Sequence, residues 1–129
     1  MKTAKPVPTD LELEILKVIW QRGHATVREV YQDLAAQRKI AYTTVLTMIG
    51  ILERKGHLKK SPGERAYVYT ATQPQSQVVQ GMVQEFVGRV FDGSLKPLLV
   101  HLVEDARTDP DELKEIEALV RERRKKHHG

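Results

Sequence analysis

The chain of 129 residues contains no cysteine, and only 5% of its residues are aromatic. Without cysteine, it has no disulfide framework, no thiolate ligands for zinc and no cysteine nucleophile. No apolar stretch approaches the roughly 18 residues of a membrane span, and no signal peptide is recognisable at the start. With 29% charged residues, these absences predict a soluble, cytoplasmic protein whose core consists of Leu, Val and Ile.

Motifs typical of enzymes are also missing. The sequence has no P-loop, no G-x-S-x-G and no G-x-G-x-x-G. Its five histidines lack the spacing of a zinc site such as H-E-x-x-H. We therefore expect no catalytic activity, no metal site and no other cofactor.

The charge is unevenly distributed along the chain. Residues 1–72 carry 12 Lys and Arg against 7 Asp and Glu, whereas residues 73–129 carry 9 against 10. A basic N-terminal part is suited to a polyanionic partner such as DNA. Charge alone fits an ordinary solvated surface equally well, so the choice depends on the pattern of elements.

The first 72 residues indicate three helices followed by a hairpin. Two T-x-x-E capping boxes, which begin at Thr9 and Thr26, open the first two helices. A third helix is expected from about Tyr42, where Ala41 is a poor N-cap, to the stop at Gly56. This order of elements is typical of a winged helix-turn-helix.

The third helix and the hairpin carry the signature of DNA binding. The helix has an apolar stripe of Val45, Met48, Ile49 and Leu52, and an opposite face of Thr43, Thr47, Gly50 and Arg54. Strands are expected at residues 58–60 and 65–70, around a turn at 61–64. A slim helix before a basic hairpin suits a protein that reads the major groove and grips the backbone. We predict a mainly α fold with a small β-hairpin, in which residues 8–72 form a winged-helix DNA-binding domain.

Residues 75–126 are expected to form three amphipathic helices after a Gln/Pro/Ser-rich joint at 73–76. Helices so thin cannot bury their apolar stripes alone. A symmetric homodimer would cover them and would space two recognition helices by about one DNA turn or a multiple of it. A monomer whose tail folds back is the alternative. The residues expected in this dimerisation region are Val79, Met82, Phe86, Leu98, Leu102, Leu113, Ile116, Leu119 and Val120.

Five segments, in order and at the right spacing, resemble the penicillinase-repressor family of bacterial winged-helix regulators, the BlaI/MecI type. They are PTDLELEILKVIW, ATVREVYQDL, YTTVLTMIGILERKGHLKK, RAYVYTA and FDGSLKPLLVHLVED, within residues 8–122. The resemblance implies a homodimeric transcriptional repressor that occupies a palindromic operator and regulates antibiotic resistance. In the best-known systems, a membrane sensor-peptidase that responds to β-lactam triggers cleavage of the repressor.

The resemblance also implies which residues bind double-stranded DNA. Base contacts fall on Thr43, Thr44 and Thr47, and wing contacts fall near Lys60 and Arg65. A threonine methyl group can pack on a thymine methyl, and its hydroxyl can bond a base edge or a phosphate. From their positions, further phosphate contacts are expected from Arg28, Arg54, Lys55 and Lys59.

The chain departs from the family pattern at two places. Family members often have Lys or Arg on the recognition helix, where this chain has Thr43, Leu46 and Ile51. The Asn-Phe pair that is cut in the cleaved members is replaced by His101-Leu102.

The sequence leaves alternatives open for the function of the domain and for the environment of two wing tyrosines. On the outer face expected for the third helix, the apolar residues Leu46 and Ile51 favour an alternative function, a winged-helix module that binds protein without sequence-specific DNA binding. For Tyr67 and Tyr69, we expect packing against the helices, with stacking on DNA sugars as the alternative.

Overall fold

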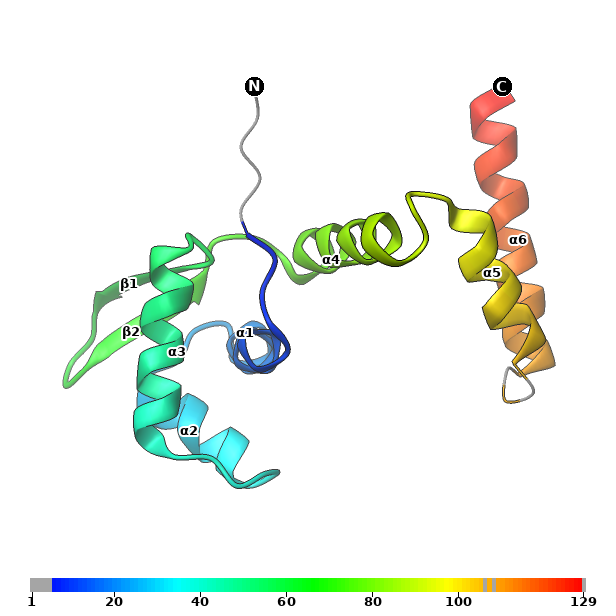
Figure 1. Cartoon of the computed structure of the whole chain (residues 1–129). Helices are drawn as coiled ribbons and strands as arrows, with labels where there is room; N and C mark the ends of the chain where they lie inside the picture. The colour runs from blue at the N-terminus through cyan, green and yellow to red at the C-terminus, as the bar shows by residue number, and fades with distance from the viewer. Residues whose placement is uncertain (1–5, 106, 108, 129) are drawn as a thin grey trace. The chain divides into compact units, whose positions relative to one another are not determined.

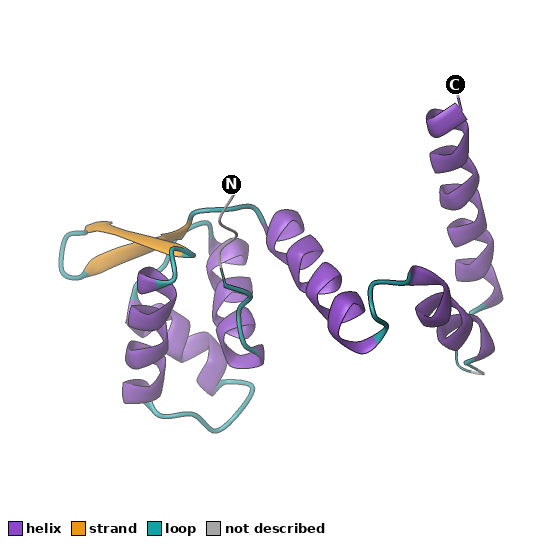
Figure 2. Cartoon of the chain, turned by 45° about the horizontal axis from the view of Figure 1, so that its top comes forward, coloured by secondary structure: helices purple, strands orange, loops and turns teal. Residues whose placement is uncertain are grey.

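The structure, a computed structural model, describes residues 6–105, 107 and 109–128 (Figure 1). The fold is helical with one antiparallel hairpin, as predicted (Figure 2). It divides into two compact units, one ending at Glu85 and the other beginning at Phe86. The elements are α1 (Asp10–Arg22), α2 (Val27–Ala35), α3 (Tyr42–Arg54), β1 (Leu58–Pro62), β2 (Tyr67–Ala71), α4 (Gln75–Val90), α5 (Leu95–Glu104) and α6 (Pro110–His128).

Both predicted capping boxes are present. The Thr9 hydroxyl accepts a hydrogen bond from the Glu12 backbone N–H at 3.3 Å, and the Glu12 carboxylate accepts one from the Thr9 N–H at 3.0 Å. Thr26 and Glu29 repeat this pattern at the start of α2, at 3.1 and 2.9 Å. The start of α3 has no side-chain cap, because Ala41 stands at the N-cap position. Tertiary packing must therefore hold this end of α3, and the Tyr42 ring contacts Tyr31 of α2 edge-on.

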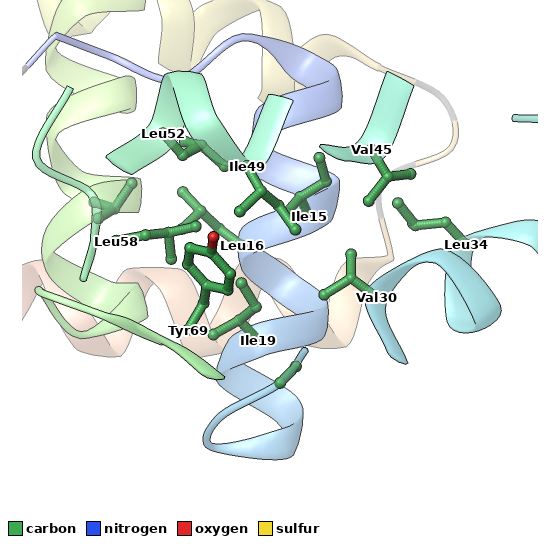
Figure 3. Packing of buried hydrophobic residues seen from close by; sticks show 12 residues of the cluster. Ile15, Leu16, Ile19, Val30, Leu34, Val45, Ile49, Leu52, Leu58 and Tyr69 are labelled. Atoms are coloured by element: carbon green, nitrogen blue, oxygen red, sulfur yellow. The ribbon is translucent and has the colours of Figure 1, made fainter. Parts of the chain in front are cut away.

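One apolar core joins all the elements of the first unit (Figure 3). Helix α3 packs on α1, α2 and β1, and every core side chain is 8% exposed or less. Full burial of each Leu, Ile or Val stabilises the fold by about 1.5–3 kcal/mol, so the apolar stripe of α3 must face inward. The cluster consists of Ile15, Leu16, Ile19, Ala25, Val30, Leu34, Val45, Ile49, Leu52, Leu58, Tyr69 and Val78.

The hairpin turn differs from the prediction. The strands pair as far as Pro62 opposite Tyr67, so the turn spans residues 63–66 rather than 61–64, and Arg65 lies in the turn rather than in a strand. Pro62 is tolerated because it stands at the end of an edge strand, where a missing N–H costs little. A Cβ on Gly63 would lie 2.8 Å from Val68 Cγ2 and collide with the Ala66 carbonyl oxygen. This close approach explains the glycine.

The two wing tyrosines have different environments. Tyr69 is buried, and its backbone N–H and C=O pair with Ala25 at 2.8 and 3.0 Å, which joins the wing to the loop before α2. Tyr67 is 53% exposed. The expectation of core packing was correct for Tyr69 and wrong for Tyr67, because the end of the hairpin extends beyond the helices.

The first turns of α4 belong to the winged-helix core. Val78 is buried in the cluster, Met82 packs against it, and the Trp20 indole N–H donates to the Gln73 carbonyl at 3.0 Å. The division between the two compact units falls within α4, between Glu85 and Phe86, which lies beyond the predicted joint of residues 73–76.

The second unit leaves most of its apolar side chains in solvent. Helix α5 has no buried residue, and the Ser94 side chain at its N-cap makes no cap hydrogen bond. Helix α6 begins at Pro110, and the Asp109 carboxylate accepts from the Asp111 N–H at 3.0 Å. The exposed apolar residues of this unit include Phe86, Val90, Leu95, Leu99, Val100, Leu102, Val103, Leu119 and Val120.

Two glycine substitutions should change stability in opposite directions. Gly63→Ala should lower the free energy of unfolding by about 1–3 kcal/mol, because the new methyl group overlaps the turn. Gly50→Ala should raise it by up to about 1 kcal/mol, because alanine favours a helix and the nearest atom, Arg54 Nη1, is 3.7 Å away. Urea denaturation of the two variants measures both changes. A stable Gly63→Ala protein with an intact wing would contradict the steric explanation.

Candidate nucleic-acid interface

The outer face of α3 brings the predicted base-contacting residues together. Thr43, Thr44 and Thr47 are all exposed and line one shallow depression with Met48. Gly50 and Arg54 continue the same face by one and two further turns. Since Val45, Ile49 and Leu52 are fully buried on the opposite side, this face is the part of α3 that a ligand can reach.

A buried ion pair holds the C-terminal end of α3. The Glu12 side chain is 2% exposed, and its two carboxylate oxygens lie 2.8 and 3.1 Å from the Lys55 ammonium. Burial acts to raise the pKa of Glu12, but hydrogen bonds from Lys55 and Thr9 and the nearby positive charge lower it overall. Lys55 thus binds the first turn of α1, and its ammonium is occupied by Glu12 instead of being available to a phosphate.

The chain after α3 is tied down by a second set of polar contacts. Gly56, with φ of 87°, ends the helix as predicted. The next residue, His57, is 4% exposed and donates from Nε2 to the Pro6 carbonyl, whereas its Nδ1 is buried without a hydrogen-bond partner in the described part of the chain. The Thr72 hydroxyl donates to the Gly56 carbonyl at 2.6 Å. His57 is not among the site residues predicted from the sequence, because a single histidine in a basic stretch gives no sign of burial.

Some cations of the first unit are paired with carboxylates, whereas those expected to contact the DNA backbone, apart from Lys55, are not paired in the described part of the chain. Arg22 bonds to Asp33 at 2.8 Å and Arg38 to Glu14 at 2.6 Å, across the surface of the helices. The Arg22 guanidinium lowers the pKa of Asp33 through this hydrogen bond. Among the described residues, no carboxylate pairs with the exposed side chains of Arg28, Arg54, Lys59, Lys60 and Arg65. These unpaired cations are available to bind an anion.

On the wing, the Lys60 ammonium lies over the exposed Tyr67 ring, 4.5 Å from the ring centroid. A cation–π contact of this kind stabilises an exposed pair by about 0.5–1 kcal/mol. It restricts where the long lysine side chain can go. Lys60 is therefore partly ordered before any ligand arrives.

The residues predicted for the dimer interface are found in three environments. Val79, Phe86, Leu102, Leu119 and Val120 are exposed. Leu98, Leu113 and Ile116 are half-buried, and Met82 packs against the winged-helix core instead. His101 and Leu102, the predicted cleavage pair, are both exposed within α5.

Comparison with known proteins places this geometry in a family. The model of the penicillinase repressor family matches residues 8–122. The chain belongs to this family. It is 27% identical over 117 residues to the penicillinase repressor of Bacillus licheniformis, and this match covers 91% of each protein. It is 33% identical over 102 residues to the transcriptional regulator BlaI of Mycobacterium tuberculosis. This match covers 78% of this chain and 74% of the relative.

Solved structures of penicillinase repressors match the first unit. The DNA-binding domain of the repressor BlaI is 32% identical, with a TM-score of 0.52 over 58% of this chain and 92% of that domain. A second structure is Bacillus licheniformis BlaI in its monomeric form in complex with the blaP half-operator. It is 33% identical, with a TM-score of 0.51 over 57% of this chain and 89% of that chain. A MarR family protein from Bacillus stearothermophilus is 14% identical and shares the fold, with a TM-score of 0.53 over 95% of this chain and 76% of that chain. The first unit is a winged helix.

Other kinds of site are not visible in the described residues of this family member. No group of three His, Cys, Asp or Glu residues there could hold a metal ion. None of the described helices is both long enough and apolar enough to cross a membrane. The relatives are named as repressors and transcriptional regulators, and the exposed face of α3 with its unpaired cations is the candidate site.

Lys55→Met should destabilise the protein by about 2–4 kcal/mol, because it leaves the buried Glu12 carboxylate without its cation. Since the folded-state pKa of Glu12 is lowered, its contribution is present above the ordinary value of 4.5 and is lost as the pH falls through the folded value. Urea denaturation between pH 3 and 7 should show this loss in the unmodified protein and less of it in the variant. Arg54→Met is the matched control, with unchanged stability expected. Equal stabilities would show that the pair contributes nothing.

Proposed function

We propose that the chain is a homodimeric transcriptional repressor that binds a palindromic DNA operator, with α3 in the major groove and the wing on the phosphate backbone. The observation that carries the proposal is the exposed threonine face of α3 beside unpaired cations. The Bacillus relative in complex with a half-operator supports DNA as the ligand. The names of the relatives support repression as the outcome.

Thr43, Thr44 and Thr47 are the proposed base-reading residues. They lie in the first two turns of α3, the end of a recognition helix that contacts base edges in helix-turn-helix proteins. Each offers a hydroxyl that donates or accepts and a methyl group that can pack on thymine. Gly50 has no steric need to be glycine within the protein, and its small size lets DNA approach the α3 backbone.

The unpaired cations are the proposed phosphate contacts. Arg28 stands in the first turn of α2, where backbone N–H groups also favour an anion. Arg54 lies on the α3 face, and Lys59, Lys60 and Arg65 lie on the wing. Such contacts orient the protein and make its affinity depend on salt, without specifying sequence.

The second unit is the proposed dimerisation region. Its exposed side chains include Leu102, Leu119 and Val120, which a symmetric partner would cover. A dimer would present two copies of α3 to the two halves of a palindrome. As a finer part of the proposal, repression is relieved through a sensor-peptidase pathway that cuts the chain at His101-Leu102. This bond lies inside α5, so cleavage would require local unfolding of that helix.

The second candidate function is a winged-helix module that binds protein. The observation that favours it is Leu46, which is 49% exposed on α3. Two experiments separate these functions. The first selects bound sequences from a random duplex library, and the second titrates the enriched duplex by anisotropy at several salt concentrations. An enriched palindrome with regularly spaced half-sites is expected for the repressor. Weak binding without sequence preference would favour the protein-binding module.

Thr47→Ala should reduce the discrimination between the enriched duplex and random DNA by roughly two- to twelvefold, about 0.5–1.5 kcal/mol, because it removes a single hydroxyl hydrogen bond. Because Thr47 is exposed, the variant should stay folded, which thermal unfolding checks. Gln32→Ala, on the exposed part of α2, is the control. Unchanged discrimination in Thr47→Ala would remove this residue from the specificity set.

Lys60→Ala should weaken binding to every sequence by a similar factor and lower the slope of log affinity against log salt by up to about one. Tyr67→Leu should weaken binding by a smaller factor with the salt slope unchanged, because Lys60 keeps its charge and loses only its ordered position. Anisotropy titrations from low to moderate salt measure both quantities. A loss confined to one sequence in Lys60→Ala would contradict the phosphate role.

A further inference from the structure

The outer face of α3 lacks the side chains that make two hydrogen bonds to one base. From Tyr42 to Leu52, the helix contains no Arg, Lys, Asn, Gln, Asp or Glu. The usual bidentate pairs, such as Arg with guanine or Gln with adenine, are therefore excluded over the first three turns. The remaining hydrogen-bonding side chains that face solvent there are threonine hydroxyls and the Tyr42 phenol.

What this face offers instead is apolar. Leu46 is 49% exposed, whereas its neighbours Val45 and Ile49 are completely buried. At 100° per residue, Leu46 lies beside the line of Thr43, Thr47 and Gly50. Isolated exposed leucines are common on protein surfaces, so exposure alone would not indicate a ligand. The position of Leu46 beside the proposed base-reading threonines, on a helix that ends at the unpaired Arg54, indicates one.

The charge around Leu46 indicates the kind of ligand. Arg54 at the end of α3 and Lys59, Lys60 and Arg65 on the wing are exposed and carry no carboxylate partner in the described residues. A protein partner for an apolar side chain in this setting would need an acidic rim. DNA provides phosphates for the cations and, in the major groove, one apolar group among the bases, the C5-methyl of thymine.

We infer that Leu46 is a specificity-determining residue that packs against a thymine C5-methyl group in each operator half-site. This inference rests on the proposed operator binding and specifies how the sequence is read. The helix selects thymine mainly by burying methyl groups, through Leu46 and the neighbouring threonine methyls. Hydrogen bonds to the bases contribute less than in a helix that carries arginine or glutamine on this face.

Replacement of single thymines by deoxyuridine tests the inference, because it removes the methyl group and leaves base pairing intact. The probe is the duplex enriched from the random library, prepared with deoxyuridine at one thymine position per half-site at a time. At the position read by Leu46, the unmodified protein should bind about fourfold more weakly, as expected for one buried methyl group. Leu46→Ala should bind the thymine duplex more weakly and show no further loss with deoxyuridine at that position.

Leu46→Met is the matched variant, because it retains apolar surface of similar size and should keep most of the sensitivity to deoxyuridine. Deoxyuridine substitution can instead reduce the affinity of Leu46→Ala by the same factor as that of the unmodified protein at every position. In that case the methyl group acts through DNA shape, and the inference is overturned. The same holds if no substitution changes affinity. A library that yields no enriched sequence would overturn the proposed function and this inference with it.

Discussion

The position of α3 against α1 is the constraint on which the rest of the molecule depends. Burial of the Val45, Ile49 and Leu52 stripe decides which face of α3 points inward, but apolar contacts are not directional. The Glu12–Lys55 pair adds direction, because a buried carboxylate must keep its donors within hydrogen-bond distance. The wing begins soon afterwards at Leu58, so the same pair positions the exposed threonine face of α3 and the wing together.

The distribution of cations separates structure from binding. Arg22, Arg38 and Lys55 are held by carboxylates of the same domain, and their charges are already neutralised in the free protein. Arg28, Arg54 and the wing cations are not. The net positive charge of the N-terminal half therefore does not identify the cations that are free to bind an anion. Unpaired cations lie at the N-terminal end of α2, on α3 and on the wing, where the proposed phosphate contacts fall.

Helix α4 contributes to both units. Its first turns place Val78 in the winged-helix core, and its last turns place Phe86 beside Phe91 in the second unit. The division by packing therefore falls within α4, beyond the Gln/Pro/Ser-rich joint. In the proposed repressor, one continuous helix leads from the DNA-binding core to the exposed apolar side chains available for dimerisation.

Local signals in the sequence determined the elements themselves: the capping boxes at Thr9 and Thr26, the stop at Gly56 and the apolar stripe of α3 each involve residues within one or two turns. The family, too, was recognisable from the order of its motifs. Only the tertiary structure decided the environment of Lys55, His57 and Tyr67 and the place of the hairpin turn. These depend on which residues distant in sequence meet in space. A pattern of hydrophobicity specifies a buried face, but it does not specify the partner of each polar side chain on the opposite element.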